Sequence, residues 1–207
     1  LDTRGDAVAA IVGYCVRRIE DWLPNDPPPA SVSEVQDVVC RRLGLAFEEV
    51  HTDAELDAVI GKYVAQGDVV FAHAKAALDN WTFAELFERV NAVGRPDRYV
   101  AVIDCRGDEK MARRFFTRWH EVAHLLVLPP RVAPPFNRDS KERCPIERLM
   151  DVIAAEIGFY PALFLPALQR CVAKHGCLSY EAIEDLRAAY CPEASFHATA
   201  IAAVKAH

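Results

Sequence analysis

Two histidines and a glutamate form the pattern His-Glu-x-x-His in this chain of 207 residues. His120 and His124 are four residues apart, so on a helix they share one face, with about 5–6 Å between their Cβ atoms. This spacing lets two imidazoles reach one tetrahedral Zn²⁺ at roughly 2.0–2.1 Å. Glu121 then lies beside the open coordination position, where it can take a proton from a water molecule. The pattern therefore predicts metal-dependent hydrolysis.

A catalytic zinc ion usually has three protein ligands, so one more is expected downstream. Glu147 is the strongest candidate, because it falls in the first turn of a predicted helix whose other face is apolar. Asp151 follows one turn later on the same side and can accept the second ring N–H of a ligating histidine. Three simpler interpretations stay open. The two histidines can be core residues, Glu147 a solvated carboxylate favoured by the helix dipole, and Asp151 an exposed helix charge.

Amide hydrolysis also needs a donor that stabilises the developing oxyanion. Tyr160, His175 and Tyr180 are candidates, and the sequence does not choose among them. A second group, Cys171-x-x-x-His175-x-Cys177, matches no common zinc module, so its cysteines are expected to serve packing.

The helix that positions His-Glu-x-x-His is expected over residues 108 to 127 or 128. Asp108 suits its N-terminus, and Pro129-Pro130 stops it before a loop at 129–143 that is rich in proline and charge. Phe115, Phe116 and Trp119 are expected in the core, and Arg113, Arg114 and Arg118 on a solvated face. Just before this helix, residues 99–105 form the best strand in the chain, whose edge could pair with an extended substrate backbone.

Apolar spacing predicts the other elements. Short strands are expected at Leu45–Val50 and Asp68–Ala72. Helices are expected at 6–22, from Ser33 to Leu43, at 53–66, 82–90 and 145–158, and as two or three segments within 162–206 that break at Gly176 and Cys191-Pro192.

Composition excludes several classes of protein. The formal net charge is −6 and no long basic run occurs, so we expect no direct contact with nucleic acid. No apolar stretch reaches about 18 residues, so no membrane span is expected. The chain begins at Leu1 without a basic-then-apolar leader. Its seven cysteines are scattered, which favours free thiols and a cytoplasmic location.

Two segments resemble the ImmA/IrrE family of gluzincin-type metallopeptidases. The first is Arg114-Phe115-Phe116-Thr117-x-x-His120-Glu121-x-x-His124-Leu125-Leu126, and the second is Glu147-x-x-Met150-Asp151-x-Ile153-Ala154-Ala155-Glu156. The strand at 99–105 and a helical tail around Leu186–Val204 are also similar to the family. Residues 33 to about 205 can be aligned, although only the two metal segments are specific.

The resemblance implies an α+β fold, a zincin-like minimal metalloprotease with a small three-stranded sheet packed on a mainly helical domain. Residues 31–207 would form this domain, after an N-terminal helix and Pro-rich linker at 1–30. It implies Zn²⁺ at His120, His124 and Glu147, with Mn²⁺ as the alternative metal, and Glu121 as the general base.

The family also implies a protein substrate. Its members typically cleave an XRE-type helix-turn-helix repressor, and the cut switches on stress-response or mobile-element genes. Three departures concern substrate choice more than metal binding: Ala123 replaces a common Gly, Gly158-Phe159-Tyr160-Pro161 replaces a tighter ending, and residues 73–98 resemble a helical insertion. Two rival functions stay open: a metal-stabilised module that docks to a regulator without cleaving it, and a metal-free helical interaction domain.

Overall fold

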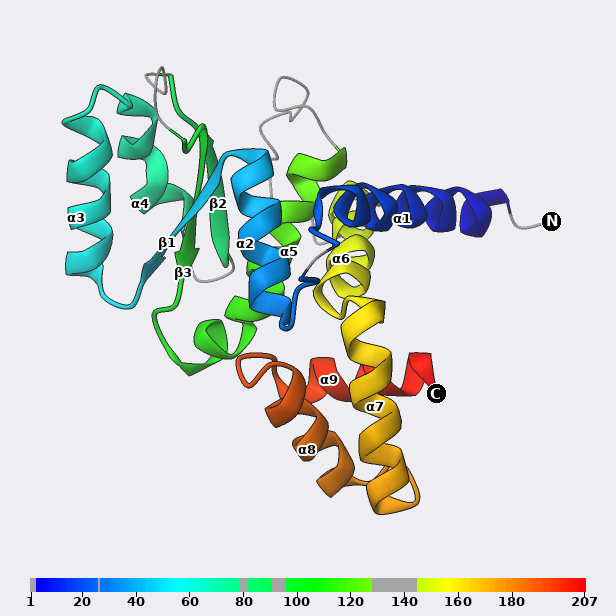
Figure 1. Cartoon of the computed structure of the whole chain (residues 1–207). Helices are drawn as coiled ribbons and strands as arrows, with labels where there is room; N and C mark the ends of the chain where they lie inside the picture. Colours follow the sequence, from blue (N-terminus) through cyan, green and yellow to red (C-terminus); the bar gives the residue numbers. More distant parts are fainter. Residues whose placement is uncertain (1–2, 26, 79–81, 91–95, 128–144) are drawn as a thin grey trace.

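The computed structural model describes residues 3–25, 27–78, 82–90, 96–127 and 145–207. This part of the chain is mostly helical with one three-stranded sheet, which confirms the α+β class (Figure 1). The elements are α1 (Thr3–Trp22), α2 (Val32–Leu43), β1 (Leu45–Val50), α3 (Asp53–Val64), the 3₁₀-helix η1 (Val69–His73), α4 (Ala74–Ala77), β2 (Ala84–Glu88), β3 (Tyr99–Asp104), α5 (Asp108–Val127), α6 (Pro145–Gly158), α7 (Pro161–His175), α8 (Tyr180–Tyr190) and α9 (Phe196–Ala206).

The central strand of the sheet is β3, and its apolar sequence explains why. All of its residues are buried, and alternate side chains enter two different cores. Val100 and Val102 face the core that α3 covers, whereas Ala101 and Ile103 face the larger core that contains α5. A strand covered on both faces needs a nearly continuous apolar run. Figure 1 shows the result, with α3 and α4 on one side of the sheet and α2 and α5 on the other.

The position of β3 overturns one expectation about substrate binding. β3 pairs in parallel with β1 and antiparallel with β2, so the strand order is β1-β3-β2. Both edges of β3 are already hydrogen-bonded, and the prediction that strand 99–105 offers a free edge is wrong. Among the three described strands, the margins of the sheet belong to β1 and β2.

The two predictions between Asp68 and Val90 are also wrong. The expected strand at Asp68–Ala72 is the 3₁₀-helix η1, and the expected helix at Thr82–Val90 contains the strand β2. In η1 only Phe71 is buried, against Tyr63, while Val69 is exposed, so the apolar run never lies in a sheet. The described residues within 73–98 are therefore not a purely helical insertion, because they include a strand of the sheet, β2, beside the one-turn helix α4.

Local capping refines the start of the second helix. Ser31, rather than Ser33, is the N-cap of α2, because its side-chain oxygen accepts a hydrogen bond from the backbone N–H of Glu34 at 3.2 Å. Gly44 then ends the helix at a φ of 65°, a left-handed conformation that glycine adopts without strain. The chain passes directly into β1.

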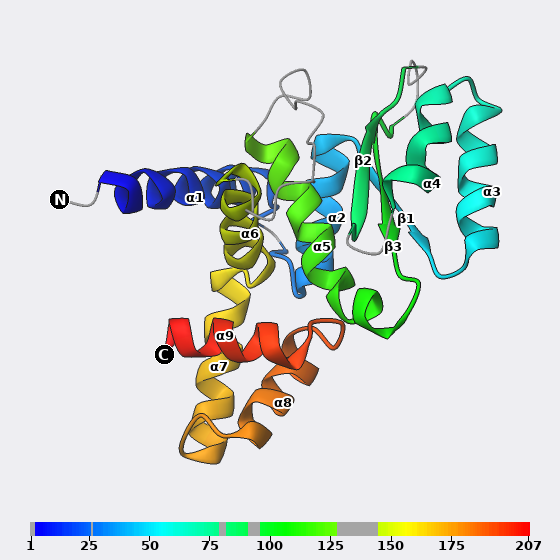
Figure 2. The same cartoon turned by 180° about the vertical axis from the view of Figure 1, so that it is seen from behind.

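The first and last helices pack around the same core as the sheet. In α1, Cys15 and Ile19 are fully buried beside residues of α5 and α6. The tail forms three helices that break at Gly176 and after Tyr190, as the sequence predicts. Figure 2 shows α7 leading away from α6, with α8 and α9 folding back. The Tyr190 hydroxyl donates a hydrogen bond to the Gly158 carbonyl at 2.9 Å and ties α8 to the end of α6.

Two further expectations concern membranes and thiols. Among the described helices, none is by itself long and apolar enough to cross a bilayer, and one bent pair, α6 with α7 at 64°, meets the length and composition requirement together. Six cysteines are free thiols in the described part of the chain, and Cys144 lies outside it. The predicted loop at 129–143 also lies outside the described residues.

Candidate metal centre

The helix α5 holds both histidines of the predicted motif in a fixed position. From Arg114 to Val127 every residue of this helix is buried or half-buried. Phe115 and Trp119 lie in the core, as predicted, and Phe116 is partly buried. On the face turned toward α6, the side chains of His120 and His124 are only 15% and 16% exposed. Tight packing around α5 therefore orders the two imidazoles before any ligand binds.

The helix α6 brings Glu147 to the two histidines, as the sequence predicts. His120 Nε2 lies 3.0 Å from Glu147 Oε2 and 3.1 Å from His124 Nε2, and His124 Nε2 lies 3.7 Å from Glu147 Oε1. Their ligand atoms all lie within 4.8 Å of one another. Glu147 thus contacts both histidines across the α5–α6 interface.

These three residues fit a tetrahedral metal ion. Ligand atoms bonded to zinc at roughly 2.0–2.1 Å stand about 3.3 Å apart along the edges of a tetrahedron. The two imidazole nitrogens are 3.1 Å apart, and each lies 3.0 or 3.7 Å from a different oxygen of the Glu147 carboxylate, so the separations fall on both sides of that value. Two imidazole nitrogens and a carboxylate oxygen are also the donor set of many catalytic zinc sites. A metal ion or a shared proton would satisfy the lone pairs that converge here.

Asp151 lies where the sequence places an orienting carboxylate. The Nδ1–H of His120 donates a hydrogen bond to Asp151 Oδ1 at 3.0 Å, and the other ring nitrogen, Nε2, faces Glu147 and His124. Burial opposes a charge on His120, but its hydrogen bonds with Asp151 and Glu147 prevail and raise its pKa to about 10. In the metal-free chain a proton therefore occupies the position that a metal ion would take.

The same contacts lower the pKa of Glu147, whereas they raise the pKa of His120. Its hydrogen bonds with His120 and His124 hold its pKa far below the usual range of a glutamate, although burial acts against this. The carboxylate is consequently ionised over the whole physiological range. An anionic oxygen ligand beside two imidazoles suits a divalent cation.

Glu121 projects from the same helix and is only 6% exposed. Its negative charge contributes to the raised pKa of His120, so the carboxylate lies near the cluster without belonging to the set of three ligand atoms. A buried carboxylate is costly unless a nearby cation offsets it. A cation held by His120, His124 and Glu147 would offset this cost.

None of the family models, curated proteins or solved structures compared with the chain matches it. The function has to be inferred from the chemistry of the cluster itself.

The three candidate oxyanion donors have contacts elsewhere in the described structure. His175 hydrogen-bonds Asp185 at 2.8 Å between α7 and α8, and the exposed Tyr180 stacks on Phe196. Tyr160 is buried at the start of α7, where burial and the charge of Glu20 raise its pKa. The structure therefore brings none of the three into the cluster of His120, His124 and Glu147.

A partly exposed ion network on the opposite side of α5 is not evident from the sequence. Arg118 pairs with Glu49 of β1 and, at 2.9 Å, with Glu193 before α9; Arg114 pairs with the same Glu193 at 2.9 Å. The expected solvated face at Arg114 and Arg118 is wrong, because these side chains fasten α5 to the sheet and to the tail. No local pattern reveals the network, since its partners are distant in the sequence.

Glu49, His51 and Cys105 form a second group of potential metal ligands among the described residues. Here the surroundings oppose a cation. Glu49 is already paired with Arg118, and Arg114 lies 3.9 Å from it. Burial, together with the nearby charge of Glu49, raises the pKa of the Cys105 thiol to about 11, so the thiol keeps its proton. This group is better explained as part of the ion network than as a metal site.

Proposed function

We propose that this protein is a zinc-dependent endopeptidase of the zincin type that hydrolyses a peptide bond in a protein regulator. The observation that supports it most strongly is the convergence of His120, His124 and Glu147 beside the buried Glu121. Its segments on α5 and α6 resemble the two metal segments of the ImmA/IrrE family. That resemblance alone suggests an XRE-type repressor as the substrate.

Each residue has a distinct task in this reaction. His120, His124 and Glu147 would hold the zinc ion, which lowers the pKa of water and polarises a carbonyl group. Asp151 keeps His120 in the tautomer that presents Nε2. Glu121 takes the proton from the attacking water and then hands it to the leaving amine. A module that only held a metal for stability would have no use for a buried carboxylate at position 121.

The sheet offers one edge for the substrate backbone near this helix. The start of β2 lies against α5, because Lys110 donates a hydrogen bond to the Thr82 carbonyl at 3.2 Å and Arg113 lies over the Phe83 ring. As an edge strand beside α5, β2 can pair with an extended segment around the cleaved bond. In this proposal β2, rather than β3, pairs with the substrate backbone.

The test is the Glu121→Gln variant, which removes the base but keeps the size of the side chain. Zinc-loaded wild type should cleave members of a quenched fluorescent peptide library, and the variant should cleave about 10²–10⁴-fold more slowly while binding the same amount of zinc. Metal content by elemental analysis is the matched control. Equal cleavage by both proteins, or none by wild type loaded with zinc or manganese, would refute the proposal.

A further inference from the structure

A buried carboxylate at the end of β3 has no part in the mechanism proposed above. The side chain of Asp104 is 0% exposed, and it accepts hydrogen bonds from two cations. Arg106 donates from Nε at 2.9 Å and from Nη2 at 2.7 Å, and Lys110 donates from Nζ at 2.6 Å. Burial acts to raise the pKa of Asp104, but these hydrogen bonds prevail and lower it. Asp104 is therefore ionised at neutral pH and holds both cations in place.

Through Lys110, this carboxylate connects the helix α5 to the edge strand β2. Lys110 lies in the first turn of α5, and its Nζ also donates a hydrogen bond to the Thr82 carbonyl at 3.2 Å. The backbone N–H of Asp104 donates to the carbonyl of the next residue, Phe83, at 2.9 Å. Both carbonyls lie directly before the first residue of β2. We call the contacts of Lys110 with Asp104 and Thr82 the β2 anchor.

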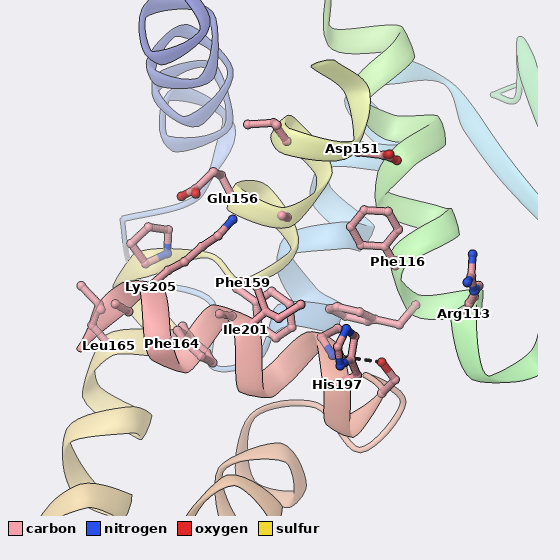
Figure 3. Close-up of a pocket in the computed structure, with 18 of the residues that line it drawn as sticks. Arg113, Phe116, Asp151, Glu156, Phe159, Phe164, Leu165, His197, Ile201 and Lys205 are labelled. Carbon is pink, nitrogen blue, oxygen red and sulfur yellow. Dashed lines mark hydrogen bonds between the residues drawn. The ribbon is translucent and has the colours of Figure 1, made fainter. Parts of the chain in front are cut away.

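The helix α5 leads from the β2 anchor to the metal centre. Lys110 precedes His120 by ten residues, which is about 15 Å along a helix axis. Figure 3 shows Arg113 and Phe116 on α5, with Asp151 of α6 beside this helix, and all three line one cavity. Asp151 accepts the hydrogen bond of His120. Open space therefore extends beside α5 from the turn after Lys110 to the metal centre.

Charged side chains hold both ends of β2. At the far end Arg89 is only 4% exposed and pairs with Asp68 at 2.9 Å. Between the two ends, Ala84–Glu88 pairs with β3 on one side and with no further strand among the described residues. A buried ion pair often adds no more stability than apolar residues of the same volume, but its hydrogen bonds fix one geometry. A strand fixed in this way binds a peptide without first paying the entropy of ordering itself.

We propose that Lys110, held by Asp104, is a positioning residue that sets the edge strand β2 against α5 for substrate binding. The inference rests on the proposed function, because it concerns the same reaction. Lys110 touches neither the metal ligands nor Glu121 and acts through the position of β2. The β2 anchor should therefore matter for peptides long enough to pair with β2, and not for peptides that reach only the metal centre.

The experiment compares Lys110→Met with wild type, both loaded with zinc, on a long and a short peptide. The long peptide has about ten residues around a bond that wild type cleaves, enough to extend along β2 at about 3.3 Å per residue. The short peptide keeps only the residues on either side of that bond. For the long peptide KM should rise at least about tenfold with kcat changed less than about twofold, as for a loss of binding alone. For the short peptide both constants should stay within about twofold.

Lys62→Met is the matched control, because it removes a lysine that joins a helix to the opposite edge strand. Lys62 of α3 pairs with Glu48 of β1 at 2.5 Å. This variant should change KM for either peptide less than about twofold. Circular dichroism would show that the variants are folded. If Lys110→Met does not fold, Lys110→Gln takes its place, with the same expected difference between the two peptides.

Hydrogen exchange provides a second measurement that needs no cleavage. Amides of Ala84–Glu88 should exchange at least about fivefold faster in Lys110→Met than in wild type, while amides of β1 keep the wild-type rate. Unchanged exchange in β2 would overturn the inference, and so would an equal loss of kcat for both peptides. If wild type cleaves no peptide, the proposed function fails. If wild type cleaves and Lys110→Met has an unchanged KM, this inference alone fails.

Discussion

Asp151 would act on the proposed metal ion through His120, without touching the metal itself. Its carboxylate fixes His120 through Nδ1, and carboxylates in this position typically raise metal affinity by about 10–100-fold. Asp151→Asn should therefore lower zinc affinity by about that factor, as measured by competition with a chromophoric chelator. Glu156→Gln is the control on the same helix, because Glu156 is not among the cluster ligands. An unchanged affinity in Asp151→Asn would mean that the hydrogen bond is incidental.

The raised pKa of His120 predicts how metal binding depends on pH. A metal ion must displace the His120 proton, which is held up to a pKa of about 10. Apparent zinc affinity should therefore rise with pH, by about tenfold per unit for the one proton released. Titrations between about pH 6 and 8 would measure the slope. A flat profile would show that His120 is already neutral in the metal-free protein.

The proton on His120, which opposes metal binding, stabilises the folded metal-free chain. The pKa of His120 is about 10 in the folded protein and roughly 6.5 when unfolded. Its stabilising contribution is therefore fully present below about pH 6.5 and is lost as pH rises through about 10. Metal-free protein thus loses stability over the range in which zinc binds more tightly.

At the scale of single residues, the sequence predicts that His120, His124 and Glu147 come together, but it places no oxyanion donor beside them. His120, Glu121 and His124 are related by helix periodicity, so their mutual geometry is local. Glu147 is predicted because a zinc ion held by two histidines needs a third ligand. Asp151 is predicted because a ligating histidine needs a hydrogen-bond acceptor, and Asp151 lies one helical turn after Glu147. Tyr160, His175 and Tyr180 have no such offset from the cluster, and only the packing of α7 and α8 decides where they lie.

Among the elements, α6 is placed against α5 by a glycine. A Cβ atom at Gly158 would lie 2.9 Å from Cδ1 of the buried Trp119, which is closer than packed carbons tolerate. Gly158→Ala should therefore destabilise the protein by about 1–3 kcal/mol despite the better helix propensity of alanine. Thermal unfolding should show a midpoint lower by roughly 2–4 °C for each kcal/mol.

Gly61 provides the matched control for this substitution. It lies within α3, and a Cβ atom added there would meet no atom within 4 Å apart from the backbone of its own helix and its chain neighbours. Gly61→Ala should raise stability by about 1 kcal/mol through helix propensity alone. If both alanine variants shifted the midpoint in the same direction, steric contact with Trp119 would not be the reason for Gly158.

The success of prediction differs between helices and strands for a physical reason. Amphipathic helices such as α5 and α6 show their buried face within a few turns of local sequence. The apolar residues Phe83, Leu86 and Phe87 have the same helical spacing, yet residues 84–88 form β2 because hydrogen bonds to β3 outweigh local propensity. Which strand pairs with which, and that β3 is central, depends on partners far along the chain.

For the whole molecule, metal binding should raise the free energy of unfolding, because the ligands come from both α5 and α6. A ligand that binds only the folded state at 100 times its Kd stabilises by about 2.7 kcal/mol. Zinc should then raise the melting temperature by about 5–10 °C, and a chelator should reverse the rise. Differential scanning calorimetry with and without zinc would measure this effect.

Glu147→Ala supplies the comparison, since it removes the one ligand that α6 contributes. This variant should lose most of the zinc-dependent rise. If zinc raised the melting temperature of Glu147→Ala as much as that of wild type, zinc would be stabilising the protein from another site.

The burial of α5 has a consequence for how this protein can vary. Up to Arg113 the helix still offers exposed positions, but from Arg114 to Val127 it offers none. One side is fixed by the sheet, one by the cluster of His120, and another by the ion pairs of Arg118 with Glu49 and Glu193. Substitutions in descendants of this chain should therefore be rare at every position from Arg114 to Val127, because none of these positions lies on a solvent-exposed face.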